Sequence, residues 1–390
     1  MEFGFTAEEE AFREDVRAFC RNYVTEEVRL AFEPGLFMEP VNVEVVRRFR
    51  DLLVQQGWLT MHWPVEWGGQ AKSSIYPFIL SQELGYYGVY GDDPTFNTIG
   101  PVLMQFGSAE VKREMLPRMA SGELSFAQSY SEPNAGTDLA SLVTRAVRDG
   151  DEYVISGHKM WSTAAHRSTH LFLAARTDPD QPRHKGISMF LVPTDAPGIT
   201  IRPIWTPGTV RTNDVFLDDV RIPATLRVGE ENQGWYCMMV SLDYERIISF
   251  EGWLRRRIEE VLEIVRTRKR DGRLLAKDLV VREKVARVFT RYRVARLFSL
   301  RNAWLVERGD VAPAPAAMEK IWVSDLHLEL LDLILDLQGE DGLAQGATEA
   351  EPGGGRTWDA WATSHLQRFG GGTNDALRSV VATRGLGLPR

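Results

Sequence analysis

The spacing of apolar residues changes twice along the 390-residue chain and divides it into three parts. Up to about residue 125, apolar side chains recur every three or four positions, as Phe12, Val16 and Phe19 do, which predicts amphipathic helices. Beyond that point the pattern alternates and turn residues become frequent, which predicts β-strands. Helical spacing then returns to the end. We therefore predict an α+β multidomain fold with an N-terminal α-helical domain (1–125), a central β domain (126–234) and a C-terminal α-helical bundle (235–390).

The helical parts also show local start and stop signals. Thr6 followed by Glu9 forms a capping-box pattern, in which each residue satisfies a backbone N–H of the first turn. We expect a loose linker over 344–356, where three glycines stand together. Further helices are predicted near 43–56, 76–85, 109–121, 234–268, 278–308, 315–337, 357–369 and 373–384.

The central part contains a clear hairpin signal. Two alternating runs, 142–148 and 153–156, are separated by Asp149-Gly150-Asp151, a turn sequence. Prolines fall between most of the other alternating runs, as expected where a strand ladder stops. Those other strands are predicted at 170–176, 187–192, 199–204 and 215–217.

Composition excludes several classes of function. A net charge of -8 argues against a general nucleic-acid binder, which needs a basic face for phosphates. The two cysteines lie far apart in sequence, which favours a reducing compartment over a disulfide framework. The N-terminus is acidic where a signal peptide needs a basic region, and no apolar run is long enough for a membrane span. We expect a cytoplasmic protein.

The segment 126–163 offers the best candidate for a ligand site. Its loop, 132–138, is short and rich in Pro, Gly and polar residues, and Ser131 and Thr137 can bring hydroxyls to a ligand. Trp161 stands at a strand end, where a flat cofactor could stack. On the residues alone, a structural turn and a packed Trp are the more common meaning. His166 and His170 have the spacing of a zinc pair, but no third ligand is evident, so no metal site is expected.

The amino-acid sequences of several segments nevertheless resemble those of one family. SEPNAGTDLASLVTRAV (131–147) and DGDEYVISGHKMWST (149–163) resemble the central domain of the acyl-CoA dehydrogenases. The resemblance covers essentially the full chain. It continues in family order through KGISMFLVP (185–193), NDVFLDDVRIP (213–223), VGEENQGW (228–235) and GGTNDALRSVVATRGLGLPR (371–390).

This resemblance implies an FAD enzyme with a helical domain, a β-barrel or sandwich domain and a four-helix bundle. Three residues are expected at the cofactor's diphosphate or adenine part: Arg268, which reaches it in a neighbouring subunit, and Asp336 and Gly339, which lie in the segment that completes that site. The segment 335–342 departs from the family pattern, because Asp336 and Glu340 replace a Gln and a Gly. By motif position, the flavin is expected to contact Gln128, Tyr130, Ser131, Thr137, Trp161, Thr163 and Thr373.

The resemblance also points to a catalytic base. Most members carry a Glu just before a Gly-Thr pair near the C-terminus, but here Gly371 precedes Gly372-Thr373. A minority, similar to the isovaleryl- and long-chain-specific enzymes, carries the base in a Glu-Arg dipeptide that matches Glu245-Arg246. We therefore predict Glu245 as the base, and we expect the Gly371 N–H to polarise the thioester carbonyl. Periodicity alone leaves open a simple ion pair between Glu245 and Arg246 or a neighbouring helix.

The implied activity is the α,β-dehydrogenation of an acyl-CoA to a 2-enoyl-CoA, with electrons passing to an electron-transfer flavoprotein. The implied assembly is a homotetramer or an α2β2-type heteromer. Two alternatives stay open: a non-catalytic subunit of a heteromeric dehydrogenase, and a flavin oxidase of a non-CoA substrate on the same fold. The acyl group and the pathway, whether fatty acid, sterol side chain or secondary metabolite, are not readable from the sequence.

Overall fold

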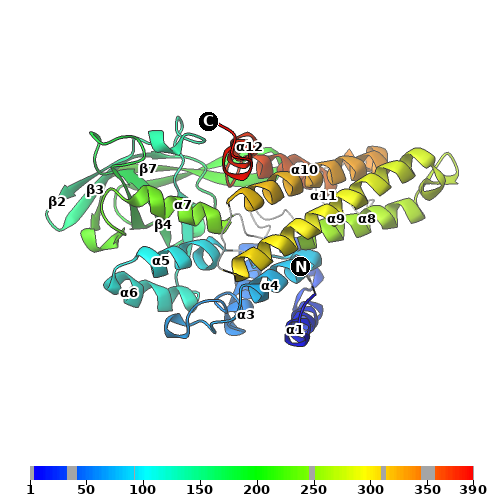
Figure 1. Cartoon of the computed structure of the whole chain (residues 1–390), viewed down its shortest axis with the longest axis horizontal. Coiled ribbons are helices and arrows are strands. Elements are labelled where there is room, and N and C mark those ends of the chain that lie inside the picture. Colours follow the sequence, from blue (N-terminus) through cyan, green and yellow to red (C-terminus); the bar gives the residue numbers. More distant parts are fainter. Residues whose placement is uncertain are drawn as a thin grey trace.

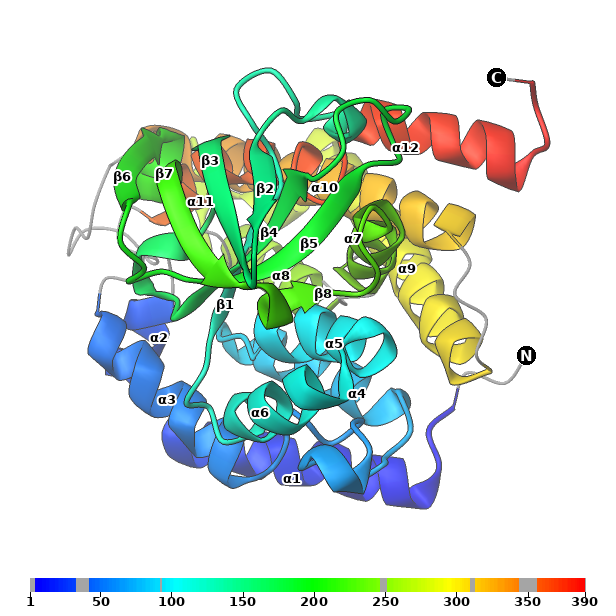
Figure 2. The same cartoon turned by 90° about the vertical axis from the view of Figure 1, so that its left-hand side faces the viewer.

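The computed structural model describes residues 4–32, 42–91, 93–245, 251–308, 313–343 and 356–389, and at 209, 243–245 and 356 it describes the backbone alone. A β domain lies at one end of the molecule and a bundle of long helices extends away from it (Figure 1). The N-terminal helices lie below both (Figure 2). The predicted linker 344–356 falls almost entirely outside the described residues.

The N-terminal part is helical, as predicted. Thr6 caps the first helix through the predicted capping box with Glu9, and Asn42 and Ser108 cap two later helices with their side-chain oxygens. A short helix over 100–106 was not predicted, because its apolar residues run together without helical spacing. The helices are α1 (Ala7–Tyr23), α2 (Glu26–Phe32), α3 (Val43–Gln55), α4 (Ile75–Tyr87), α5 (Gly100–Phe106) and α6 (Ala109–Ala120).

The central part forms one eight-stranded sheet. Its order is β6-β7-β3-β2-β4-β5-β8, and β1 pairs in parallel with β4. The strands enclose a cluster of alternating inward residues that includes Ile155, Leu173 and Val215. Their bounds are β1 (Phe126–Ser129), β2 (Arg145–Asp149), β3 (Glu152–Lys159), β4 (His170–Arg176), β5 (Ile187–Pro193), β6 (Ile199–Thr206), β7 (Val210–Pro223) and β8 (Arg227–Val228).

The predicted hairpin is present with a tighter turn. Asp149 pairs with Glu152, so the turn consists of Gly150 and Asp151, and Gly150 has a φ of 63°. Strand β7 is much longer than the predicted run 215–217, because it pairs with β3 along one edge and with β6 along the other. Pro203 is accommodated in β6, which ends the sheet order and needs no N–H donor on its open side.

The C-terminal part forms the bundle. Leu254, Val288 and Leu330 belong to its buried cluster, which joins the three longest helices. The shorter helices α11 and α12 pack against α10. The bounds are α7 (Gly234–Glu245), α8 (Glu251–Thr267), α9 (Leu279–Glu307), α10 (Pro313–Gln338), α11 (Arg356–Ser364) and α12 (Asn374–Val380). No helix among the described residues is both long and apolar enough to cross a membrane.

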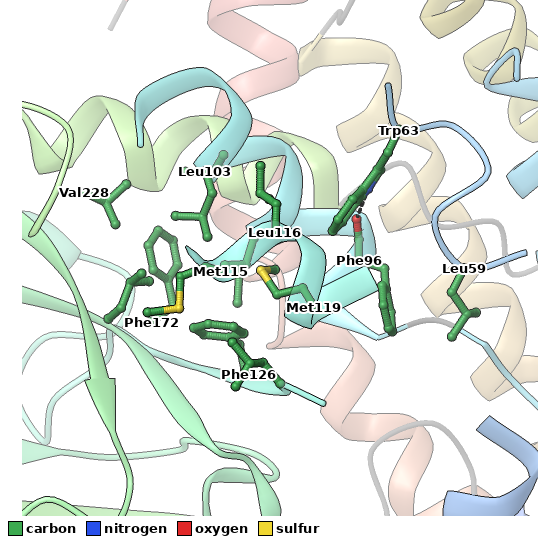
Figure 3. Packing of buried hydrophobic residues seen from close by; sticks show 14 of the residues in the cluster. Leu59, Trp63, Phe96, Leu103, Met115, Leu116, Met119, Phe126, Phe172 and Val228 are labelled. Atoms are coloured by element: carbon green, nitrogen blue, oxygen red, sulfur yellow. Dashed lines mark hydrogen bonds between the residues drawn. The ribbon is translucent and has the colours of Figure 1, made fainter. Parts of the chain in front are cut away.

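Helix α7 belongs to a different core from the rest of the bundle. The sequence predicts one helix over 234–268, but the structure describes α7 ending at Glu245 and α8 beginning at Glu251. Cys237 and Met238 of α7 are buried in the cluster that joins the N-terminal helices to the sheet. Met115, Phe126 and Phe172 belong to this same cluster (Figure 3). Helix α7 is therefore held where the N-terminal helices meet the β domain.

Candidate active site

Strand β1 connects the core to the predicted cofactor loop. Its residues alternate: Tyr130, which directly follows β1, is 6% exposed in the cluster shared with α7, whereas Ala127 lies in the cluster inside the sheet. The Gln128 Nε2 lies 3.2 Å from the Ser241 Oγ of α7, and the Tyr130 hydroxyl lies 2.8 Å from the same oxygen. These side chains bond to α7, so a contact between either of them and the flavin stays a prediction.

The structure brings Ser131, Trp161 and Thr163 together. The Met160 N–H donates to the Ser131 carbonyl over 2.9 Å, which places the end of β3 beside the start of the loop. Trp161 is 51% exposed and has a φ of 63°, a left-handed conformation that is uncommon for a bulky residue. The Thr163 Oγ1 lies 3.4 Å from the Thr212 Oγ1. An exposed indole at this junction of β3 and the loop offers a face on which a flat ring can stack.

A buried ion pair anchors the predicted cofactor loop, 132–138, to β3. The Lys159 Nζ is fully buried and donates to the Tyr130 carbonyl over 2.9 Å and to the Glu132 carboxylate over 2.8 Å. The Glu132 carboxylate also accepts the N–H groups of Val143 and Thr144 at 2.7 and 2.9 Å. Burial lowers the pKa of Lys159 to about 8, so this amine stays charged at neutral pH. The pair ties both ends of the loop to β3.

Thr137 lies on the exposed part of that loop. Glu132 and Ala135 exchange two backbone hydrogen bonds of 3.0 Å, which close the turn before it. After it, the Asp138 carboxylate pairs with Arg183 at 2.8 Å. The hydroxyl of Thr137 is thus carried by an outward loop that is fixed on either side.

The glycines that precede α12 form a second candidate part of the active site. Gly371 and Gly372 have φ values of 65° and 93°, conformations that favour glycine. Lys320 of α10 donates to the Gly372 carbonyl and to the Asn374 side chain, both over 2.9 Å. The Thr373 Oγ1 caps α12 by accepting the Ala376 N–H over 3.1 Å, which leaves its own O–H as a donor.

Glu245 is the last residue of α7. It follows Ser241 by four residues, which is about one helical turn. Because Ser241 bonds to β1, the chain segment that carries Glu245 is attached to the strand that leads into the cofactor loop. Arg246, the alternative ion-pair partner, lies outside the described residues.

The predicted adenine-side residues lie elsewhere. Helix α8 has 17 residues, so it separates Glu245 from Arg268 by roughly 25 Å of helix. The Arg268 Nη1 donates to the Gln338 carbonyl at 2.9 Å and pairs with Asp341 at 3.0 Å. The Asp336 carboxylate pairs with Lys284 at 2.7 Å. Gly339, with a φ of 66°, directly follows Gln338, whose carbonyl accepts from Arg268, and so belongs to this group.

Comparison with known proteins decides the family. Three domain models of the acyl-CoA dehydrogenases match in order: the N-terminal domain over 6–123, the middle domain over 127–220 and the C-terminal domain over 232–386. The chain belongs to the acyl-CoA dehydrogenase family. It is therefore an oxidoreductase, and FAD is its cofactor.

Full-length relatives agree with this assignment. The chain is 34% identical to acyl-CoA dehydrogenase FadE26 of Mycobacterium tuberculosis, with 100% of this chain and 99% of that protein covered. Among solved structures it resembles the Tcur3481-Tcur3483 steroid ACAD, with a TM-score of 0.92, 35% identity and 100% of both chains covered. It also resembles a chain of the ChsE4-ChsE5 complex from Mycobacterium tuberculosis, with a TM-score of 0.88, 34% identity and 100% of both chains covered.

The described residues of this acyl-CoA dehydrogenase fit the flavin end of FAD better than its diphosphate end. Trp161 presents an open aromatic face, and Ser131, Thr163 and Thr373 present hydroxyls. At the far end of the bundle, by contrast, Asp341 already neutralises Arg268, and more carboxylates stand nearby. A diphosphate carries negative charge, so it would compete with Asp341 for Arg268, although Lys269, Arg270 and Arg273 of the neighbouring hairpin are exposed.

Three residues near the site were not singled out from the sequence: Lys159, Ser241 and Lys320. The alternation in β3 places Lys159 on the same side as Ile155, but a buried Lys needs a partner that alternation does not reveal. Ser241 is an isolated hydroxyl in the apolar run 234–242, which is a weak signal for a buried hydrogen-bonding group.

Proposed function

We propose that this protein oxidises acyl-CoA thioesters at the Cα–Cβ bond with Glu245 as the α-proton base. The observation that carries the proposal is the placement of Glu245 at the end of α7, the helix that Ser241 bonds to β1. The position that most family members use for the base is Gly371, which cannot accept a proton.

The protein and its cofactor carry out different steps of the proposed reaction. Glu245 removes the α-proton while the hydrogen on the β-carbon leaves with two electrons, and the Cα=Cβ bond forms. When bound, FAD supplies the acceptor for that hydride. An electron-transfer flavoprotein or a similar acceptor then takes up the two electrons, so that each turnover yields one enoyl-CoA.

Proton removal places negative charge on the thioester oxygen, so an N–H donor is needed near it. We propose the backbone N–H of Gly371 for this role. Lys320 bonds to the Gly372 carbonyl and the Asn374 side chain, and these contacts support the turn that presents that N–H. Trp161, Ser131, Thr163 and Thr373 orient the flavin, and Thr137 extends this surface on the loop.

For the substrate, we propose a CoA thioester whose acyl part is a steroid side chain. The support is the 35% identity over full length with a steroid ACAD and the high structural similarity to it. Straight-chain fatty acyl-CoAs, which have the same reacting thioester end, are then expected to turn over slowly. They lack the ring system whose binding energy a steroid substrate would contribute.

We also propose that the protein works in a heteromer with a second, related chain. The carboxylates of the segment 336–341 support this, because Asp341 and Asp336 pair with Arg268 and Lys284, two cations that a diphosphate could otherwise contact. In such an assembly the second chain supplies the arginine and the adenine-side segment for the flavin bound at this β domain. The Tcur3481-Tcur3483 and ChsE4-ChsE5 structures are two-component assemblies by their descriptions.

The test is anaerobic addition of acyl-CoAs to the flavin-loaded protein, purified alone and with its co-expressed related chain. We expect the flavin absorbance of the complex to bleach with a steroid side-chain CoA ester. Glu245→Gln should bind FAD, yet its bleaching rate should fall by about 1,000-fold, within the range of about 100- to 10,000-fold that a general base contributes. Glu263→Gln, an exposed glutamate on α8, is the matched control and should behave as wild type. Normal bleaching in Glu245→Gln refutes the assignment of the base.

A further inference from the structure

We propose that Ser241 is a positioning residue, which fixes α7 to β1 and thereby sets the place of the base at the end of that helix. This inference rests on the proposed role of Glu245. It concerns a residue that neither touches the substrate in the proposed mechanism nor belongs to any cofactor motif.

The contact is a convergence of three polar groups, of which Tyr130 and Ser241 are buried and Gln128 is half-buried. The Ser241 side chain is fully buried, and its oxygen receives the Gln128 amide N–H over 3.2 Å and shares a hydrogen bond with the Tyr130 hydroxyl over 2.8 Å. One hydroxyl can accept two hydrogen bonds and donate one, so both contacts are compatible. A buried group left without its partner is costly, which favours this single arrangement.

The start of α7 is fixed by the close packing of Gly234 against Ser188 and Met189, whereas the contacts nearer to Glu245 define the helix position less sharply. Met238 and Met239 pack in the apolar cluster, and methionine side chains adapt readily to small shifts of a helix. Hydrogen bonds instead require a narrow range of distance and angle. Among the described residues, the two bonds to Ser241 are therefore the side-chain hydrogen bonds that oppose a shift or rotation of the second half of α7 against the sheet.

The same strand also sets the position of the cofactor loop. Lys159 holds the Tyr130 carbonyl at 2.9 Å, while the Tyr130 hydroxyl lies against Ser241. The residue after Tyr130 is Ser131, one of the proposed flavin contacts. Tyr130 thus connects the loop that orients the flavin to the helix that carries Glu245, and Ser241 is the point of attachment on the helix side.

The decisive experiment compares Ser241→Ala with Ser188→Ala. Ser188 is also fully buried, and its hydroxyl makes two hydrogen bonds of 2.8 Å, to Thr177 and to the Asn232 N–H, but none to α7 or the loop; its backbone lies against Gly234, at the opposite end of α7 from Glu245. In Ser241→Ala we expect FAD affinity and KM to stay within about twofold, while the single-turnover bleaching rate falls about 10- to 100-fold, as for a misplaced catalytic group. Ser188→Ala should keep the wild-type rate.

Two further readouts separate positioning from a general loss of structure. With an α-deuterated thioester, the isotope effect on bleaching should increase in Ser241→Ala, because α-proton removal becomes the slow step. Tyr130→Phe should add little to Ser241→Ala in the double variant, since both remove the same attachment. If Ser241→Ala fails to fold, Gln128→Met with Tyr130→Phe removes the bonds from the strand side and should show the same slowed bleaching.

Wild-type bleaching in Ser241→Ala, or a loss that comes from weaker FAD binding alone, overturns this inference. Its failure is distinguishable from failure of the proposed function. If Glu245→Gln is inactive and Ser241→Ala is fully active, only the positioning role of Ser241 is refuted. If Glu245→Gln is active, the assignment of Glu245 as the base is refuted.

Discussion

Replacing Lys159 by Met tests how the cofactor loop is held. Methionine has a similar length and no charge, so it removes the cation while filling the space. The Glu132 carboxylate, 4% exposed, would keep its two backbone N–H donors but lose the ammonium 2.8 Å away. Removing one partner of a buried ion pair costs about 3–5 kcal/mol. Because two donors remain on Glu132, we expect a loss near the lower end, about 3 kcal/mol.

The assay is urea unfolding of the apoprotein, combined with FAD titration by flavin fluorescence. Lys159→Met should lower the free energy of unfolding by the amount above and weaken FAD binding, because Ser131 and Thr137 lose their anchored loop. Adding Glu132→Gln should restore much of the stability, since the uncharged amide needs no counter-charge. Lys284→Met, which breaks an exposed pair with Asp336, is the control and should cost less than about 1 kcal/mol. A change below about 1 kcal/mol in Lys159→Met, with unchanged FAD affinity, would refute the reasoning.

Three other variants test separate parts of the account. Burial raises the pKa of Glu319 from 4.5 to about 7, so between these pH values the folded state binds a proton that the unfolded state releases. The free energy of unfolding should therefore fall by roughly 3 kcal/mol as the pH rises from about 4.5 to 7. Glu319→Gln should remove this pH dependence in urea unfolding, and an unchanged pH dependence would contradict the assignment to Glu319. Gly208→Ala puts a Cβ 2.4 Å from the Thr363 Oγ1 at a φ of 78° and should destabilise the protein by about 1–3 kcal/mol in the same assay, whereas wild-type stability would contradict this packing. Gly371→Glu combined with Glu245→Gln returns a carboxylate to the position that is more common in the family. Because the φ of 65° at Gly371 disfavours a side chain, we expect at best partial recovery of turnover and a loss of about 1–2 kcal/mol in the free energy of unfolding. Full recovery without that loss would show that the turn at Gly371 accepts a side chain without strain.

Much of the fold was predictable because each pattern matched a local cause. Strand β4 (His170–Arg176) has the predicted bounds, since a buried apolar run flanked by turn residues leaves little freedom. The helix over 234–268 was predicted in one piece because its apolar spacing is similar on both sides of Glu245. Spacing alone does not say which core a helix face joins, and α7 and α8 join different ones.

The candidate site was less accessible to sequence reasoning. Glu245 is proposed only through resemblance, because an acidic residue near a helix end is most often an ordinary surface or ion-pair group. The attachments of the site depend on residues far apart in the chain: Lys159 meets Glu132 across 27 residues, and Ser241 meets Gln128 across 113. Such contacts are set by the tertiary packing, and no local period encodes them.

The most direct test of the central claim isolates proton removal from hydride transfer. A 3-thia-acyl-CoA has sulfur in place of the β-carbon, so only its α-proton can react, and in D2O the loaded enzyme should exchange that proton for deuterium, as followed by NMR or mass spectrometry. The account predicts rapid exchange in the wild type and almost none in Glu245→Gln, with FAD bound equally in both. Equal exchange in the two proteins would contradict it, because some other group would then be the base.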